Sequence, residues 1–243
     1  MNKFFFVHLQ KTGGISLLWR LRRVFPDPST YPNQSDGDTW ADGPQMSTDL
    51  LMQRWANPER RNEIQLIAGH FPLCSMQLLR QEFISFTVLR EPVERTLSFL
   101  RHYRINHPAA GERSLEEIYE DPFIARNILR NHMTKMLSLT TKEMTDGVLT
   151  DIEMTSDHLQ RATENLAAMK LVGVTERLED FAQLLAQEFA WDLGSPIYSN
   201  DTPPARVSQA FRKRIARDSS LDVELYRYAD ELNRAVTADR PRR

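Results

Sequence analysis

The chemistry-bearing residues nearest the start of the chain are Lys11-Thr12-Gly13-Gly14, with Ser16 two positions further on. Two glycines permit positive φ angles and a close approach of the backbone to a ligand. Lys11 can contact an anionic oxygen, and Thr12 or Ser16 adds a hydroxyl donor. This combination indicates a binding site for a phosphate-like anion. The lysine precedes the glycines, so the pattern is not the nucleotide-binding loop G-x-x-x-x-G-K-[ST].

Arg90 and Ser98 form a second possible anion site. Arg90 directly follows the apolar run Phe83–Leu89, and Ser98 lies about two helical turns after it. A guanidinium and a hydroxyl suit a second phosphate, and hydrogen bonds to charged groups contribute about 1.5–3 kcal/mol each. The alternative is a salt-bridged surface arginine beside an ordinary helix serine.

These residues must be positioned by short apolar segments that are typical of buried strands. Helical or polar sequence separates them, which predicts an α/β fold with a mostly parallel central sheet, helices on both faces and a helical second half. Open sheets of this kind bind ligands at the carboxyl ends of their strands. The expected strands are Phe4–Leu9, Ile64–Gly69, Phe83–Leu89 and Leu171–Val174.

Apolar spacing of three and four residues predicts helices in several places, and we expect a single domain over residues 1–243. Two polar segments, 26–62 and 138–156, are expected to be loops on the acceptor side or lids. The first is rich in Pro, Asp, Gly and Ser between Pro26 and Pro44. The expected helices are Ile15–Val24, one that starts at Pro92, Ser156–Met169, Glu176–Phe189, Ala205–Arg217 and Asp222–Val236.

Bulk composition excludes several classes of protein. The chain has 243 residues, of which 41% are hydrophobic and 26% charged, with a formal charge of -2. General binding of nucleic acid or of an anionic membrane surface needs a basic excess, which is absent. Cys74 is the only cysteine, so no internal disulfide can form. No apolar run is long enough for a signal sequence or a membrane span, and we therefore expect a cytoplasmic protein.

Together the two anion-binding motifs carry a family resemblance. FVHLQKTGGISLL resembles the 5′-phosphosulfate loop, and FTVLREPVERTLSFLRHY resembles the 3′-phosphate motif, of sulfotransferases that use 3′-phosphoadenosine 5′-phosphosulfate (PAPS). The resemblance is to the carbohydrate-type group that contains the uronyl 2-O-sulfotransferases. Gln10 stands where that group commonly has proline. Weaker similarity at Val172–Leu178 and Asp222–Tyr226 extends the resemblance over about residues 3–230.

The resemblance implies a P-loop-NTPase-like three-layer α/β/α fold and PAPS as the sulfate donor, with no metal. Lys11 would also stabilise the bridging oxygen between phosphorus and sulfur, which gains negative charge as the S–O bond breaks. The implied 5′-phosphosulfate ligands are Lys11, Thr12, Gly13, Gly14 and Ser16, and the implied 3′-phosphate ligands are Arg90 and Ser98.

Sulfuryl transfer also needs a general base for the acceptor hydroxyl. His70 directly follows an expected strand, and related carbohydrate sulfotransferases carry a catalytic histidine in a comparable G-H segment, so His70 is our candidate. The alternative is a histidine that only caps the strand. His8 is expected to orient the loop. Glu91 is a second possible base, although it could instead pair with Arg95.

The segment 131–135 (Asn-His-Met-Thr-Lys) lies on an expected helix. By resemblance it would line the acceptor cleft, and the alternative is a solvated helix face. The acceptor itself remains open among a carbohydrate, a glycolipid, a peptide tyrosine and a small hydroxylated metabolite. The near-neutral charge argues against a highly sulfated polyanion such as heparan. The oligomeric state is not indicated by the sequence.

The function that these features predict is a PAPS-dependent sulfotransferase with a small-molecule or glycan acceptor and no nucleic-acid partner. Two alternatives remain. An ATP-dependent small-molecule kinase would use a similar loop, although the usual triphosphate motif is missing. A non-catalytic nucleotide-binding protein would keep the anion sites and lack a functional base.

Overall fold

The computed structural model describes residues 2–33, 36, 46–197 and 206–238. Its strands are β1 (Phe4–Val7), β2 (Thr30–Tyr31), β3 (Leu66–Gly69), β4 (Ile84–Leu89) and β5 (Leu171–Val174). Its α-helices are α1 (Gly14–Val24), α2 (Thr48–Ala56), α3 (Pro58–Glu63), α4 (Ser75–Leu78), α5 (Pro92–Asn106), α6 (Leu115–Tyr119), α7 (Pro122–Ile124), α8 (His132–Ser138), α9 (Ser156–Ala168), α10 (Leu178–Phe189), α11 (Gln209–Asp218) and α12 (Ser220–Ala238). Short 3₁₀ turns are η3 (Pro108–Ala110), η5 (Gly147–Leu149) and η6 (Thr175–Arg177), and η4 (Ala125–Leu129) is a π-helix.

The strands form one sheet in the order β2-β3-β1-β4-β5, and every pair is parallel. Val7 at the end of β1 lies opposite Gly69 of β3 and Thr87 of β4. Since parallel strands point the same way, the segments that follow β3, β1 and β4 emerge side by side at one edge. The parallel sheet that the apolar runs predict is thus confirmed.

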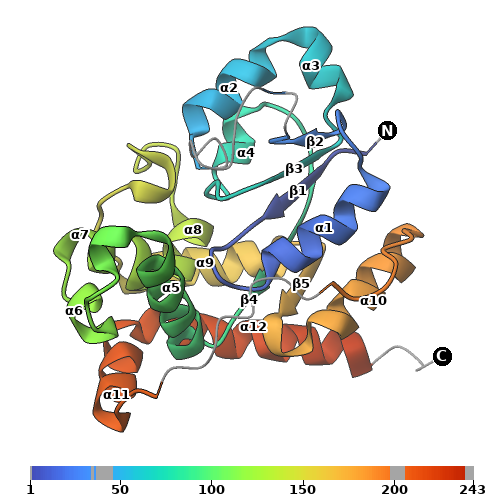
Figure 1. Cartoon of the computed structure of the whole chain (residues 1–243). Helices are drawn as coiled ribbons and strands as arrows, with labels where there is room; N and C mark the ends of the chain where they lie inside the picture. The colour runs from blue at the N-terminus through green and yellow to red at the C-terminus, as the bar shows by residue number, and fades with distance from the viewer. Residues whose placement is uncertain (1, 34–35, 37–45, 198–205, 239–243) are drawn as a thin grey trace.

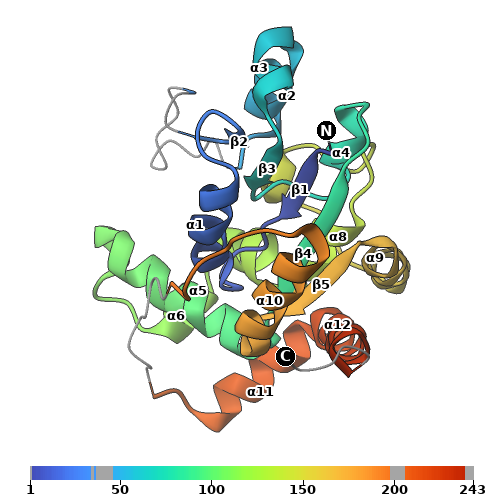
Figure 2. The same cartoon turned by 90° about the vertical axis from the view of Figure 1, so that its right-hand side faces the viewer.

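Alternation along β1 explains why the sheet is covered on both faces. Phe4 and Phe6 pack into a core with α1 and α10, whereas Phe5 and Val7 pack into a core with α2, α8, α9 and α12. Successive side chains of a strand point to opposite faces, so an entirely apolar strand requires a helical layer on each side. Figure 2 shows α1 and α9 on opposite sides of the sheet. The fold is the expected three-layer α/β/α arrangement.

A third apolar cluster lies beyond the sheet. It joins Leu97 and Leu100 of α5 to Ile118 of α6 and to Phe211 and Ile215 of α11. Figure 1 shows α5, α6 and α7 grouped to one side of the sheet, with α11 below α6. This cluster fixes α5 and the π-helix η4 next to the sheet edge at which β4 ends.

The expected helices are confirmed with small shifts in their ends. The helix at Pro92 runs to Asn106, and the expected helix Ser156–Met169 ends at Ala168. The segment Ala205–Arg217 becomes α11, which begins at Gln209, while residues 198–205 lie outside the described part of the chain. Thr155 precedes α9, and its hydroxyl lies 2.9 Å from Nδ1 of His158 in the first turn.

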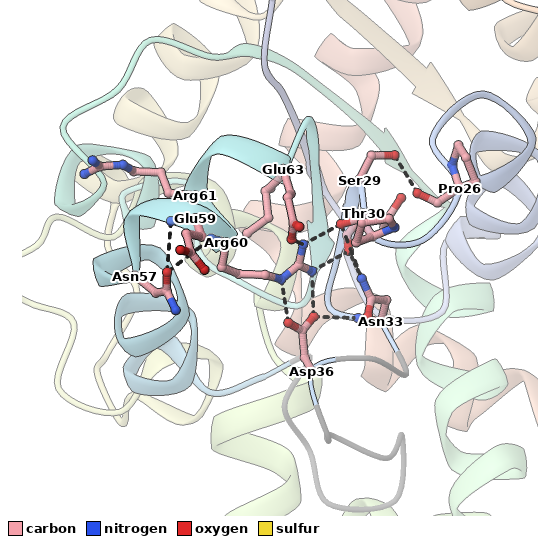
Figure 3. Close-up of polar contacts among 12 residues, drawn as sticks. Pro26, Ser29, Thr30, Asn33, Asp36, Asn57, Glu59, Arg60, Arg61 and Glu63 are labelled. Atoms are coloured by element: carbon pink, nitrogen blue, oxygen red, sulfur yellow. Dashed lines mark hydrogen bonds and ion pairs between the residues drawn. The ribbon is translucent and has the colours of Figure 1, made fainter.

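Part of the segment 26–62, which is expected to be a loop, instead forms a strand and two helices. β2 adds an edge strand to the sheet, and α2 and α3 fill most of the second half. Arg60 of α3 makes a bidentate ion pair with Asp36, at 2.7 and 2.8 Å, and its Nη2 donates to the carbonyl of Thr30 at 3.1 Å. Figure 3 shows this arginine between α3 and β2. Residues 34–35 and 37–45 of the expected loop lie outside the described residues.

The other expected loop, residues 138–156, contains only the turn η5 between α8 and α9. Buried side chains anchor it, because Val148 is 1% exposed and Thr150 is also 1% exposed. Within the described residues, none of the helices combines the length and the apolar character that crossing a bilayer requires.

Candidate active site

A cavity of about 710 Å³ lies at the edge where β3, β1 and β4 end. His70 directly follows β3, Lys11 lies in the loop after β1, and Arg90 directly follows β4. The sheet order therefore brings together three candidates that are far apart in the sequence. The described residues that line the cavity are His8, Gln10, Lys11, Gly13, Gly14, Ile15, Ser16, Met46, His70, Arg90, Ser98, Phe99, His102, Tyr103, His107, Phe123, Ile124, Ile128 and Leu149.

The loop between β1 and α1 has an unusual backbone. Lys11 and Gly13 both adopt left-handed conformations, with φ angles of 67° and 79°. Glycine takes this conformation without strain, whereas a lysine there costs roughly 1–3 kcal/mol and needs its surroundings to hold it. Alternation of right- and left-handed residues turns successive N–H groups toward one point, which creates a concave anion site.

Side chains from the neighbouring strand and helix bind carbonyl oxygens of this loop. Nδ1 of His70 lies 2.6 Å from the carbonyl oxygen of His8. Nε of the fully buried Arg95 donates to the carbonyl of Gln10 at 3.1 Å. The start of the loop is thus held from β3 on one side and from α5 on the other.

The rest of the loop is held in the same way. Nη1 of Arg90 donates to the carbonyl of Lys11 at 3.1 Å. The hydroxyl of Thr175, just after β5, donates to the carbonyl of Thr12 at 2.7 Å. Thr12 itself donates from its hydroxyl to the carbonyl of Leu9 at 2.9 Å.

Each carbonyl oxygen from residue 8 to residue 12 therefore accepts a hydrogen bond from a side chain. In a trans peptide the N–H points opposite to the preceding C=O, so the N–H groups of residues 10–13 point away from these side chains. The N-terminus of α1 follows at once, and its first N–H groups have no acceptor within the helix. This arrangement presents several N–H donors and the positive end of a helix dipole to an anion.

Gly14 permits close packing of His8. A Cβ atom at Gly14 would lie 2.0 Å from Cδ2 of the His8 ring, far inside van der Waals contact. His8 is buried, and burial, with the nearby charges of His70 and Lys11, lowers its pKa well below the usual value. Its ring is neutral and fills the space beside the helix start, which agrees with the orienting role expected for it.

Positive charge dominates the cavity. Burial, together with repulsion from Arg90, Arg95 and Arg101, lowers the pKa of Lys11 to about 8. No Asp or Glu side chain is found among the described residues that line the cavity. Cations in a cavity whose described lining holds no carboxylate favour a strongly anionic ligand, whose charge would raise the pKa of the lysine again.

His70 has a defined tautomer. A carbonyl oxygen can only accept, so the contact with His8 requires the proton of His70 to be on Nδ1. Nε2 is then the unprotonated nitrogen. Burial lowers the pKa of His70 to about 4, and the charges of Lys11 and Arg95 act in the same direction. The ring is neutral at pH 7 and lines the cavity, so Nε2 can accept a proton there.

Arg90 and Ser98 both line the cavity, which brings the two candidates of the second motif together. Glu91 does not: its carboxylate accepts a hydrogen bond from the N–H of Glu94 at 2.8 Å and caps α5. The expected pairing of Glu91 with Arg95 is wrong. The guanidinium of Arg95 is directed to backbone carbonyls instead.

Of the five candidates in the first motif, four line the cavity and Thr12 does not. Ser16 lines it together with Gly13 and Gly14. Thr12 is fully buried, and its hydroxyl serves the carbonyl of Leu9 rather than the cavity. Its contribution to an anion site would come from its backbone.

An aromatic face of α5 is a part of the site that sequence reasoning missed. Phe99, Tyr103 and His107 line the cavity at intervals of four residues. Neighbouring rings are stacked, with centroids 5.9 Å apart for the first pair and 3.8 Å apart for the second. The spacing of aromatic residues after Ser98 was the signal that could have revealed it, because residues four apart share one helix face.

Neither interpretation of residues 131–135 is confirmed. Four of them begin α8, and His132 and Lys135 are at most 1% exposed, so the helix face is not solvated. None of these residues lines the cavity. Asp222 accepts hydrogen bonds from the N–H groups of Met133 and Thr134, at 3.1 and 2.7 Å, and binds the start of the helix into the core.

The chain is similar in sequence to known sulfotransferases. No family model matches the chain. It is 27% identical over 182 residues to heparan-sulfate 6-O-sulfotransferase 2 of Homo sapiens and, to the same extent, to that of Mus musculus. The matched stretch is 63% of this chain but only 30% and 29% of the two relatives, so the chain spans less than a third of their length. This similarity confirms the resemblance to carbohydrate sulfotransferases that the two anion-binding motifs predict.

Proposed function

We propose that this chain is a sulfotransferase that moves the sulfuryl group of PAPS to a hydroxyl group of a carbohydrate acceptor. The observation that carries the proposal is the composition of the cavity. It contains Lys11, Arg90 and a loop of N–H donors, with no carboxylate among its described lining residues. The names of the two curated relatives, which are heparan-sulfate sulfotransferases, support the same chemistry.

The residues present fit PAPS at both ends. The N–H groups of the loop and the ammonium of Lys11 would hold the 5′-phosphosulfate, because the loop carbonyls are already bound by side chains. Arg90 and Ser98 would hold the 3′-phosphate. A cavity of about 710 Å³ lies within the usual size range of a ligand site, roughly 300–1,000 Å³.

The aromatic face of α5 suits the purine of the same molecule. The stacked rings of Phe99, Tyr103 and His107 give this side of the cavity a partly apolar, aromatic lining. Ring faces favour offset stacking with another aromatic system. The loop and this face would then hold the nucleotide from opposite ends.

When bound, PAPS supplies an activated sulfuryl group, which passes to the acceptor oxygen while the bridging oxygen keeps the electron pair of the broken S–O bond. Lys11 is the cation that can stabilise charge on that bridging oxygen. The α1 N-terminus acts in the same sense, because its dipole is positive at this end. Both are fixed before reaction by the side chains that hold the loop.

His70 accepts the proton of the acceptor hydroxyl. Its Nδ1 donates to the carbonyl of His8, which leaves Nε2 as the basic atom. The low pKa of about 4 keeps the ring neutral and ready to accept at physiological pH. A base of this pKa is weak, so the proton moves to it as the acceptor oxygen bonds to sulfur and becomes acidic.

Titration calorimetry with the desulfated product, 3′-phosphoadenosine 5′-phosphate (PAP), tests donor binding. We expect a dissociation constant in the micromolar range, about -8 kcal/mol. Transfer is then followed with radiolabelled PAPS, and His70→Gln is expected to keep PAP binding while losing about 10²–10⁴-fold in kcat. Failure to bind PAP below millimolar concentration would reject the proposal. Magnesium-dependent consumption of ATP would instead indicate a kinase.

A further inference from the structure

A second cavity, of about 400 Å³, adjoins the first. Met46 and Leu149 line both cavities, so these two side chains form their common wall. The remaining lining comes from α2, from the end of α4 and from the connection between α8 and α9. Figure 1 shows this connection at the same end of the molecule as the start of α2. Its described lining residues are Met46, Ser47, Thr48, Asp49, Met52, Leu78, Thr141, Met144, Thr145, Asp146, Gly147 and Leu149.

The common wall is tied to the loop that binds the donor. Nε2 of Gln10 lies 3.4 Å from Sδ of Met46. On the far side, a Cβ atom at Gly147 would lie 3.0 Å from the carbonyl oxygen of Met46, and Gly147 has a φ of 50°. The connection after α8 therefore packs closely on the chain just before α2, in a conformation that favours glycine. The second cavity is therefore formed by closely packed segments, and only the side chain of Met46 separates it from Gln10, the neighbour of Lys11.

Charge differs sharply between the two cavities. The second is lined by the carboxylates of Asp49 and Asp146 and by several hydroxyl groups, with no Lys, Arg or His among its described lining residues. Both aspartates are exposed, and no ion pair joins either of them to a described side chain. The first cavity has the opposite composition, with cations and no carboxylate.

We propose that the second cavity receives the acceptor and selects an amino sugar that carries no anionic group; this rests on the proposed function. Asp49 and Asp146 can accept charge-assisted hydrogen bonds from an ammonium group and from sugar hydroxyls. A sulfate or carboxylate on the acceptor would instead face two like charges, which is unfavourable. Met52 and Met144 add flexible apolar surface for the C–H faces of the ring.

An uncharged or cationic acceptor would distinguish this chain from the two relatives. Their names specify heparan sulfate, which is a polyanion. A chain that binds such a polymer needs cations along the acceptor path. Here the described lining of the acceptor side supplies carboxylates instead.

The test uses the full chain at pH 7 with radiolabelled PAPS and three acceptors: a glucosamine oligomer, its N-acetylated form, and desulfated, N-acetylated heparin. We expect kcat/KM to be about tenfold higher for the glucosamine oligomer than for the heparin derivative, since two exposed charged contacts worth about threefold each give that factor. Asp49→Asn and Asp146→Asn should each lower kcat/KM for the glucosamine oligomer by about three- to tenfold. Asp180→Asn, an exposed position outside both cavities, is the matched control.

Charge reversal gives the sharpest readout. The double variant Asp49→Lys/Asp146→Lys should reduce the preference for the glucosamine oligomer by about 100-fold or reverse it, while PAP binding measured by calorimetry stays unchanged. Equal rates on all three acceptors, a preference for the heparin derivative, or transfer to none of them while PAP binds would each overturn the inference and leave donor binding intact. Absence of PAP binding would reject the proposed function itself, and the inference with it.

Discussion

The carbonyl oxygen of Gln10 accepts a hydrogen bond from Nε of Arg95 at 3.1 Å, in a place where the arginine is fully buried. The other guanidinium nitrogens donate to the carbonyls of Ile128, at 2.7 Å, and Leu129, at 3.3 Å. One side chain therefore joins the anion-binding loop to the π-helix η4, although the two lie more than 100 residues apart. Since Ile128 also lines the cavity of about 710 Å³ at the strand ends, Arg95 contacts the backbone of two segments that line it.

Replacing Arg95 by methionine should destabilise both the fold and the loop. The variant would leave three buried carbonyls without their donor, and breaking such a buried charged network costs about 3–5 kcal/mol. We expect urea unfolding to show a loss of that order and calorimetry to show weaker PAP binding. Arg217→Met is the control, because Arg217 is an exposed arginine outside the cavity. Equal unfolding midpoints for the two variants would show that Arg95 has no such role.

Lys11 and Arg90 should fail in different ways when each is replaced by alanine. In the proposed reaction Lys11 would lie where charge develops, so Lys11→Ala is expected to lower kcat by about 10²–10³-fold with a smaller effect on PAP binding. Arg90 would bind the 3′-phosphate in reactant and product alike, so Arg90→Ala should weaken PAP binding by about 10–100-fold. Steady-state kinetics and calorimetry on both variants separate the two effects. Small and equal losses would reject this division of roles.

The pH dependence of kcat/KM should show a fall on the alkaline side and none near pH 6.5. Lys11 is charged below its pKa of about 8 and loses its charge above it, so the free enzyme loses activity as the pH rises through about 8. His70, with a pKa of about 4, stays neutral throughout the range from 5 to 8. Lys11→Arg should move the alkaline fall upward, because arginine keeps its proton. A fall centred near 6.5 would show a general base with an ordinary histidine pKa.

His132 should make the fold sensitive to acid. Burial, with the charges of Arg95 and Lys135, lowers the pKa of His132 well below its usual value of 6.5. The unfolded chain therefore takes up a proton below pH 6.5 that the folded chain does not, and the free energy of unfolding falls as the pH falls. The expected slope is about 1.4 kcal/mol per pH unit for this residue.

The variant His132→Leu removes this proton uptake. Urea unfolding between pH 7 and pH 5 should then show a slope smaller by about the same amount than in the parent chain. His107→Leu is the control, since His107 is exposed and close to solvent. An unchanged slope for His132→Leu would mean that the ring is protonated in the folded state.

Local pattern was enough to predict the central strands and the convergence of the motifs on one edge. Phe4–Val7 and Ile84–Leu89 are short, apolar and followed by chemistry-bearing residues, and parallel strands bring such ends together. The position of each motif directly after a strand was therefore enough to predict that the motifs meet. The catalytic parts of the site depend on these two strands and on β3.

Partners distant in sequence explain what the pattern did not show. Arg60 meets Asp36 across 24 positions, and that pairing holds β2 and α3 in a segment whose composition is typical of a loop. Asp222, about 90 positions away, accepts hydrogen bonds from the start of α8, and His132 of this helix is buried although residues 131–135 are mostly polar. The sequence shows that a residue is polar. Whether that residue can be buried depends on a hydrogen-bond or ion-pair partner that can lie far away in the sequence.

Met46 and Leu149 separate two cavities that are built from different parts of the fold. His70, Lys11 and Arg90 are placed by strand ends, whereas the second cavity is assembled from connections outside the sheet. Substitutions or insertions in those connections can alter one cavity without displacing a strand. Related chains with this sheet can therefore differ in the second cavity while the residues at the strand ends keep their positions.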